Sequence, residues 1–136
     1  MASEETKALS DEADVANWIK YAQSDRRAAQ SLFASGDYSV CAEMCQHMLE
    51  KILKALIVFQ TGERPPYEHN LKRLADMVTG IAIPSRIVDI LLNVSPHYRF
   101  ARYPGFGDLS LYTAEYTRNL LDEAEEAYGW FLQQIK

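Results

Sequence analysis

The chain has 136 residues and a formal net charge of −5, with 48% hydrophobic and 24% charged residues. A chain of this length suits one domain and can bury a core without disulfide staples. The negative charge argues against indiscriminate binding to nucleic-acid backbones, and no apolar run approaches the roughly 20 residues of a membrane-spanning helix.

The N-terminal stretch MASEETKALSDEAD is acidic and polar. It lacks the basic start and the apolar centre of a secretory signal, so we expect a cytoplasmic protein with no membrane contact. Residues 1–10 are predicted to form a flexible tail, and residues 11–136 a single domain.

Apolar residues recur with the 3.6-residue period of a helix, and no window alternates as a strand would. The sequence therefore predicts an all-α protein, an up-and-down bundle of about five helices. The first helix is expected to start with Ser10 as its N-cap and to stop at Gly36, which can adopt the left-handed conformation of a C-cap. Its inward-facing residues are predicted to be Val15, Trp18, Ile19, Ala22, Ala29, Leu32 and Phe33.

The second helix has the clearest apolar face and is expected to end at Gly62. Cys41 and Cys45 lie four residues apart on that face. Two thiolates cannot complete a four-ligand zinc site, and His47 points to another face, so we expect reduced core thiols and no metal or cofactor. The predicted face comprises Val40, Cys41, Met44, Cys45, Met48, Leu49, Ile52, Ala55, Leu56 and Phe59.

Three further helices complete the predicted bundle. A short one lies near residues 69–78, the next is capped by Ser85 and runs through Asn93, and the last runs from about Ser110 to the end. The inward-facing residues of these last two helices are predicted to be Ile87, Ile90, Leu91 and Val94, and then Ala114, Thr117, Leu120, Leu121, Ala124, Ala127, Tyr128, Phe131 and Ile135.

The stretch PHYRFARYPGFGD, residues 96–108, joins the last two helices and concentrates arginines, aromatic rings, a histidine and glycines. Guanidinium groups form bidentate hydrogen bonds with phosphate oxygens, and aromatic rings stack on bases. We therefore predict that a ligand is bound by Arg99, Arg102, Tyr103 and His97. The alternative is structural, because rings also cover the end of a bundle and arginine also caps helix C-termini.

Short connections favour antiparallel neighbours in a bundle. If the helices alternate in direction, segments 61–69 and 96–109 meet at one end. Arg64 and His69 would then join the same ligand-binding region, with Lys72 and Arg73 nearby. The sequence thus predicts a locally basic, aromatic end on an acidic protein.

The stretches YSVCAEMCQHMLEKILKALIVFQTGERPPYEHNLKRL and HYRFARYP resemble the HEPN domain over about residues 12–134. The resemblance implies a helical bundle that is commonly homodimeric and often works with a minimal nucleotidyltransferase in a toxin–antitoxin system. It also implies nucleotide or RNA binding. One large branch of the family consists of metal-independent ribonucleases with an Arg-x4–6-His motif before the last long helix.

Arg102 stands where the arginine of that motif is expected, but the positions five to seven residues on are Gly107, Asp108 and Leu109. None of these can move protons near neutral pH as histidine does. Arg64 and His69 satisfy the spacing in a different loop. His69 is instead expected to help start the third helix or to hydrogen-bond across the bundle.

Two main functions follow from these observations. The first is a homodimeric binding or partner module that contacts a nucleotide, RNA or a nucleotidyltransferase-type protein. The alternative is a ribonuclease in which Arg102 works with His69 or His97, the histidine coming from the same or the partner subunit. A purely structural dimerisation protein is a third reading, favoured if Tyr116 and Trp130 expose apolar surface on the last helix.

Overall fold

The computed structural model describes the backbone of residues 4–136 and the side chains of residues 14–136. The predicted all-α architecture is confirmed, since the described residues contain helices and no strand. The elements are α1 (Glu4–Ser35), α2 (Tyr38–Thr61), α3 (Leu71–Asp76), α4 (Ser85–Val94), α5 (His97–Phe100), a 3₁₀ turn (Leu109–Leu111) and α6 (Ala114–Gln133). No helix in this part of the chain is both long and apolar enough to cross a membrane.

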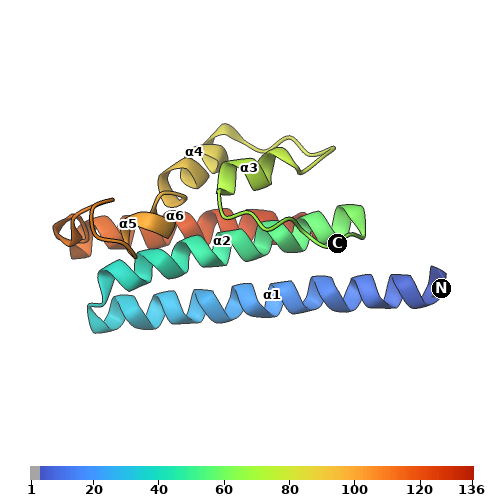
Figure 1. Ribbon diagram of the computed structural model, residues 1–136, viewed down its shortest axis with the longest axis horizontal. Helices are drawn as coiled ribbons and strands as arrows, with labels where there is room; N and C mark the ends of the chain where they lie inside the picture. Colours follow the sequence, from blue (N-terminus) through green and yellow to red (C-terminus); the bar gives the residue numbers. More distant parts are fainter. Residues whose placement is uncertain (1–3) are drawn as a thin grey trace.

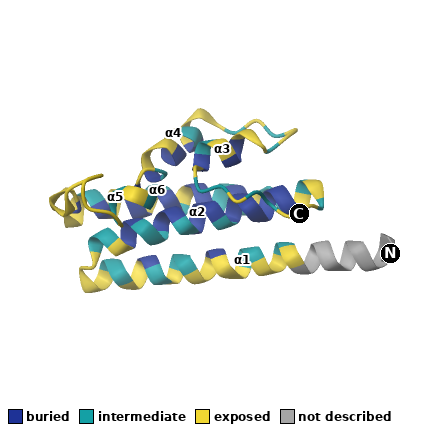
Figure 2. Cartoon of the chain, viewed as in Figure 1, coloured by how far each residue is buried: buried dark blue, intermediate teal, exposed yellow. Residues whose placement is uncertain are grey.

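Three long helices, α1, α2 and α6, run side by side (Figure 1), and α3 and α4 lie across the side of α2 and α6 away from α1. Helix α2 is the centre of this arrangement because it packs against every other α-helix. Most of its length is buried (Figure 2), in keeping with the apolar face read from the sequence.

The core forms where the apolar stripes of these helices meet around α2. Cys41 and Cys45 are buried and free, as predicted. Val40 and Phe59 do not face inward as predicted, being 40% and 42% exposed, because they lie at the edges of the stripe near the two ends of α2. Tyr116 and Trp130 are partly buried against the core, so the apolar surface that a purely structural dimer would use is largely covered there.

Several helix ends differ from the prediction. Helix α1 begins at Glu4, so the cap predicted at Ser10 is wrong, because the residues before Ser10 are mostly good helix formers that continue the helix. Residues 1–3 lie outside the described part, and the flexibility predicted for residues 1–10 stays a prediction. Gly62 ends α2 as expected, with φ 67° in the left-handed region.

Helices α3 and α6 start later than the periodicity suggests, because capping residues set their starts. Asn70 caps α3 by accepting a hydrogen bond from the Arg73 backbone. Thr113 caps α6 by accepting a hydrogen bond from the Tyr116 backbone N–H, so α6 starts at Ala114 and not at the predicted Ser110. Ser85 is the first residue of α4 rather than its cap.

The connection between α2 and α3 runs back along α2 instead of staying at its end (Figure 1). The side-chain amide of Gln46, in the first half of α2, donates to the backbone carbonyl of His69 at 2.9 Å. The chain that follows α4 also lies over this half of α2, where Arg102 pairs with Glu43. The prediction that the two segments share one end of the bundle is therefore wrong: they meet over the middle of the molecule, and Arg64 stays just past the end of α2.

Candidate functional site

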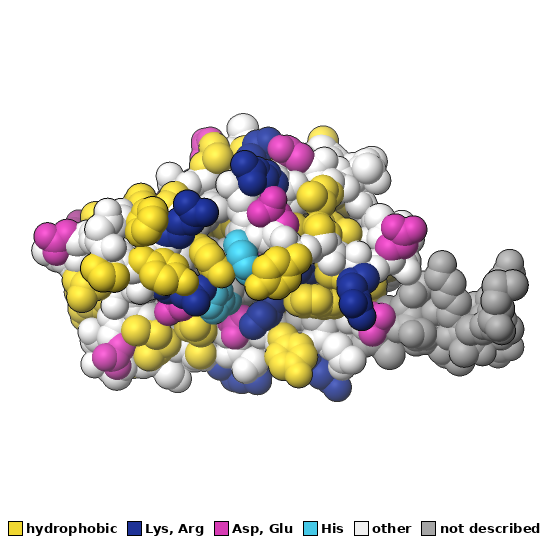
Figure 3. All heavy atoms as spheres, viewed as in Figure 1, with side chains coloured by type: hydrophobic (Ala, Val, Ile, Leu, Met, Phe, Trp, Pro, Cys, Tyr) yellow, Lys and Arg dark blue, Asp and Glu magenta, His cyan; other side chains and the backbone are white. Residues whose placement is uncertain are grey.

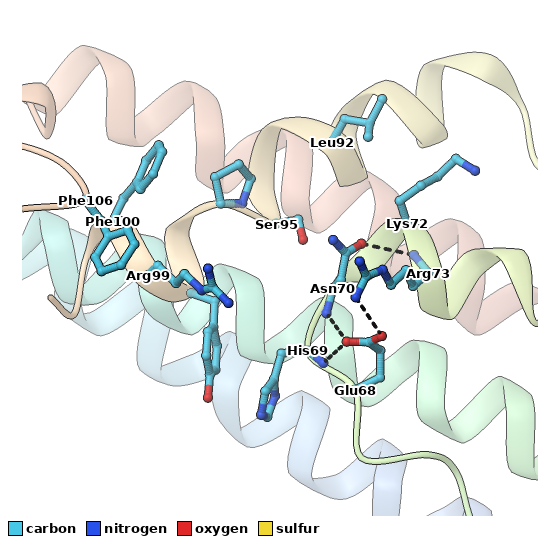
Figure 4. Close-up of a pocket in the computed structure, with 12 residues that line it drawn as sticks. Glu68, His69, Asn70, Lys72, Arg73, Leu92, Ser95, Arg99, Phe100 and Phe106 are labelled. Carbon is cyan, nitrogen blue, oxygen red and sulfur yellow. Dashed lines mark hydrogen bonds and ion pairs between the residues drawn. The ribbon is translucent and has the colours of Figure 1, made fainter.

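A pocket of about 740 Å³ opens between the start of α3 and the α4–α5 corner (Figure 4). One side carries the basic side chains of Lys72 and Arg73, and the other carries Arg99 with two phenylalanine rings. Its lining consists of Glu68, His69, Asn70, Lys72, Arg73, Leu92, Ser95, Pro96, Tyr98, Arg99, Phe100 and Phe106. The pocket thus offers positive charge and apolar ring faces to the same volume.

The three basic side chains of the pocket differ in how they are held. Arg73 lies 3.6 Å from the carboxylate of Glu68, which also accepts hydrogen bonds from two backbone N–H groups that lower its pKa. Lys72 pairs with Asp76 on the same helix. Arg99 has no carboxylate partner among the described side chains, and its guanidinium lies 5.8 Å from the centre of the Phe106 ring. Arg99 is therefore the cation most free to pair with a bound anion.

His69 and Tyr98 form the floor of the pocket. Their rings stack at 4.2 Å between centres with an angle of 15°. His69 Nδ1 lies 2.9 Å from Glu50, and since a carboxylate can only accept, Nδ1 donates. The expected hydrogen bond of His69 across the bundle is thus confirmed, and it fixes the ring that Tyr98 packs against.

Glu50 anchors this floor from inside α2. It is buried, yet it accepts hydrogen bonds from His69, from Lys54 at 3.0 Å and from Gln46 at 3.1 Å. Burial alone would raise the pKa of Glu50, but these donors outweigh it and hold the pKa below its ordinary value. Glu50 therefore carries a negative charge in the interior that three neighbours stabilise.

Arg102 contacts the same tyrosine but does not line the pocket. Its guanidinium lies 4.7 Å from the centre of the Tyr98 ring, and its Nε is 3.2 Å from Glu43 Oε1. His47 Nε2 is 3.6 Å from the same carboxylate oxygen, while His47 Nδ1 donates to the amide oxygen of Gln46. Burial lowers the pKa of His47, so the neutral ring presents a lone pair at Nε2 beside Glu43 and Arg102.

His97 is placed differently from the prediction that it contacts a ligand. The ring is 2% exposed and lies between two tyrosine hydroxyls, with Nδ1 2.7 Å from Tyr112 and Nε2 3.0 Å from Tyr116. Burial lowers its pKa to about 4. The imidazole is therefore neutral, with one nitrogen donating and the other accepting, and it ties the α4–α5 corner to the start of α6.

The remaining predicted residues lie outside the main pocket. Arg64 is exposed in the segment after α2. Tyr103 is 47% exposed and lines a second pocket of about 530 Å³ formed by residues 100–105 and 107–109. Of the predicted set, the structure brings His69 and Arg99 into one pocket, places Arg102 in contact with the ring of Tyr98, and leaves Arg64 apart.

Reading the sequence by apolar periodicity misses Glu43 and Glu50 as parts of this region and places His47 only on a face of α2 away from the two cysteines. The signal was available, because these three residues follow one another at intervals of four and three along α2 and so share one side of it. Among the side chains that the structure describes, no group of three potential ligands is placed to hold a metal ion.

Comparison with known proteins links most of the chain to one family. The profile of the HEPN domain matches residues 15–135. No curated protein matches the sequence. The fold is similar to that of TT1696 from Thermus thermophilus, with a TM-score of 0.81 and 22% identity over 88% of this chain and 97% of the other. It is also similar to ST0689, described as an archaeal HEPN homologue, with a TM-score of 0.73 and 25% identity over 90% of this chain and 98% of the other.

Proposed function

The chain belongs to the HEPN domain family, and from that premise we propose that it acts as a binding module, not as an enzyme. Its pocket takes a phosphate-bearing ligand, a nucleotide or RNA. The protein works as a homodimer together with a nucleotidyltransferase-type partner in the cytoplasm, in a toxin–antitoxin-like pair, as the resemblance of its sequence to the family implies.

The observation that carries the proposal is the guanidinium of Arg99, which has no carboxylate partner among the described side chains and lies beside aromatic rings in the 740 Å³ pocket. A planar guanidinium binds phosphate oxygens through two parallel hydrogen bonds. Phe100 and Phe106 supply ring faces next to that cation, where a base can stack. Charge and ring face together suit a nucleotide better than either an isolated anion or an apolar ligand.

We expect the Arg99→Ala variant to bind uridine monophosphate about 10- to 100-fold more weakly than the wild type, because it loses a charged hydrogen-bond donor. Titration calorimetry of the purified protein measures the change. Arg27→Ala is the matched control, since Arg27 is an exposed arginine on α1 that does not line the pocket. A monomeric wild-type protein with no affinity for nucleotide, RNA or a nucleotidyltransferase would contradict the proposal.

A ribonuclease is the second candidate, and one contact favours it. His47 and Arg102 share the carboxylate of Glu43, which places a titratable ring beside the arginine that matches the family motif. His69 Nδ1 is engaged by Glu50, and His97 is buried with both nitrogens engaged. Of the three histidines, His47 is thus the one best placed to move a proton there.

Cleavage of RNA without metal separates the two functions. Our proposal predicts no cleavage by the wild-type protein in the presence of a chelator, measured on a labelled RNA by gel electrophoresis. Cleavage that is lost in both Arg102→Ala and His47→Gln, in variants that keep the wild-type circular dichroism spectrum, would establish the second candidate instead. The His97→Gln variant tests the buried histidine in the same assay.

A further inference from the structure

Aromatic rings and basic groups form a continuous line of contacts that leads out of the pocket. The Tyr67 ring meets the ring of His69 edge-on at 5.1 Å between centres. His69 stacks on Tyr98, and the guanidinium of Arg102 lies 4.7 Å from the centre of Tyr98. The line thus runs from the segment after α2, across the floor of the pocket, to the residues that follow α5.

The same line continues through the 100–109 segment. Arg102 lies 5.4 Å from the ring centre of Tyr103, and Tyr103 meets Phe106 at 6.3 Å. Phe106 in turn contacts the guanidinium of Arg99, which lines the main pocket. We call the line from Tyr67 to Phe106 the ring track.

The ring track is open to solvent at both ends, while His69 and Tyr98 in its middle are half-buried. Tyr67 is 93% exposed at one end, and Phe106 is 51% exposed at the other. On the face seen in Figure 3, hydrophobic, basic and histidine side chains gather next to one another. Exposed rings in contact with cations leave ring faces and positive charge available to one ligand.

Two pockets lie along this track, and Phe100 lines both of them. The first holds about 740 Å³ and the second about 530 Å³. A single nucleotide can occupy one pocket only, whereas Tyr67 and Tyr103 lie outside the first pocket and a ligand confined to it would not use them. A ligand that uses the whole track must be longer than a mononucleotide.

We infer that the ring track binds an unpaired nucleic-acid strand of several nucleotides, which crosses α5 and stacks its bases on Tyr67, Tyr103 and Phe106. The inference rests on the proposed function and specifies its ligand. Bases in a duplex stack on one another and offer no free faces, so a line of exposed rings suits single strands.

The charges along the track agree with this ligand. Glu68 lines the first pocket and pairs with Arg73, and Glu43 pairs with Arg102. The carboxylate of the exposed Asp108 lines the second pocket, where it accepts a hydrogen bond from the Ser110 backbone N–H. Arg99 has no such partner among the described side chains. Phosphates therefore meet cations on a protein that is acidic overall, and binding is expected to weaken as salt rises.

The test compares uridine monophosphate, an unpaired oligouridylate of eight nucleotides and an RNA duplex of the same length, by calorimetry or fluorescence anisotropy with the full chain. We expect the strand to bind at least about 10-fold more tightly than the monophosphate and the duplex. Equal affinity for strand and monophosphate, or for strand and duplex, would overturn the inference while leaving the proposed function in place. Absence of binding to all three would overturn both.

Two variants locate the strand. Tyr67→Ala and Tyr103→Ala are each expected to weaken strand binding about 5- to 100-fold through lost stacking, and to leave binding of the monophosphate unchanged. Tyr67→Phe keeps the ring and is expected to bind like the wild type. Phe59→Ala is the matched control, an exposed ring at the end of α2 with no part in the track. Unchanged strand affinity in both tyrosine variants would contradict the inference.

Discussion

The Glu50→Ala variant is expected to lose about 3–5 kcal/mol of unfolding free energy, the largest loss we predict for a single substitution. Glu50 is 8% exposed, and its nearest cation, Lys54, is 5% exposed. Their charged atoms lie 3.0 Å apart. Alanine would leave the Lys54 ammonium in the interior without its counterion, and that desolvated charge is what makes the loss large.

The same substitution is expected to change the pocket, because Glu50 also accepts hydrogen bonds from His69 and Gln46. Without Glu50 the His69 ring loses the acceptor that orients it against Tyr98. We therefore expect weaker nucleotide binding as well as lower stability, even at a temperature where the variant is folded.

Urea denaturation followed by circular dichroism measures the loss. The Glu126→Ala variant is the control, because Glu126 forms an ion pair with Arg86 on the surface, where removal of one partner changes stability little. Glu50→Gln keeps a hydrogen-bond acceptor without the charge and is expected to fall between the wild type and Glu50→Ala. A Glu50→Ala variant as stable as Glu126→Ala would show that the buried pair contributes nothing.

The helices could be predicted from the sequence because their signal is local. The 3.6-residue period identifies α2 and α6, and the buried residues of α4 are those the period selects. Gly62 marks the end of α2 because few other residues adopt its backbone conformation. The periodicity does not predict where α1 starts. Residues with high helix propensity precede Ser10, and none of them interrupts the helix, which begins at Glu4.

The positions of the loops could not be predicted, because alternation between two ends of a bundle requires helices of similar length. Helix α2 has 24 residues and spans about 36 Å, whereas α3 has six residues and spans about 9 Å. A chain that returns along α2 before forming α3 does not alternate between two ends. His69 and Arg99 were predicted for the site because their chemistry is visible in the sequence, while Glu50 was missed because its link to the site, the hydrogen bond from His69, comes from another segment.

The stability of the wild-type protein is expected to fall by about 3 kcal/mol between pH 6.5 and pH 4 through His97 alone. The folded protein holds the pKa of His97 at about 4, below the ordinary value of 6.5, because the ring is buried. Within that window the unfolded chain binds the proton and the folded chain does not, so acid favours unfolding. The contribution is complete above pH 6.5 and is lost progressively as the pH falls toward 4.

A His97→Gln variant isolates this effect, because glutamine offers both a donor and an acceptor to Tyr112 and Tyr116 but does not titrate. Unfolding free energies from urea titrations at intervals between pH 4 and 7 give the slope for each protein. As the pH falls, the unfolding free energy of the wild type should decrease more steeply than that of the variant. In the middle of the window the difference between the two slopes should correspond to the uptake of up to one additional proton on unfolding. The carboxylates contribute equally to both proteins, so the difference between the two slopes belongs to His97. Parallel slopes would mean that His97 is protonated as readily in the folded protein as in the unfolded chain, and that the α4–α5 corner opens to water.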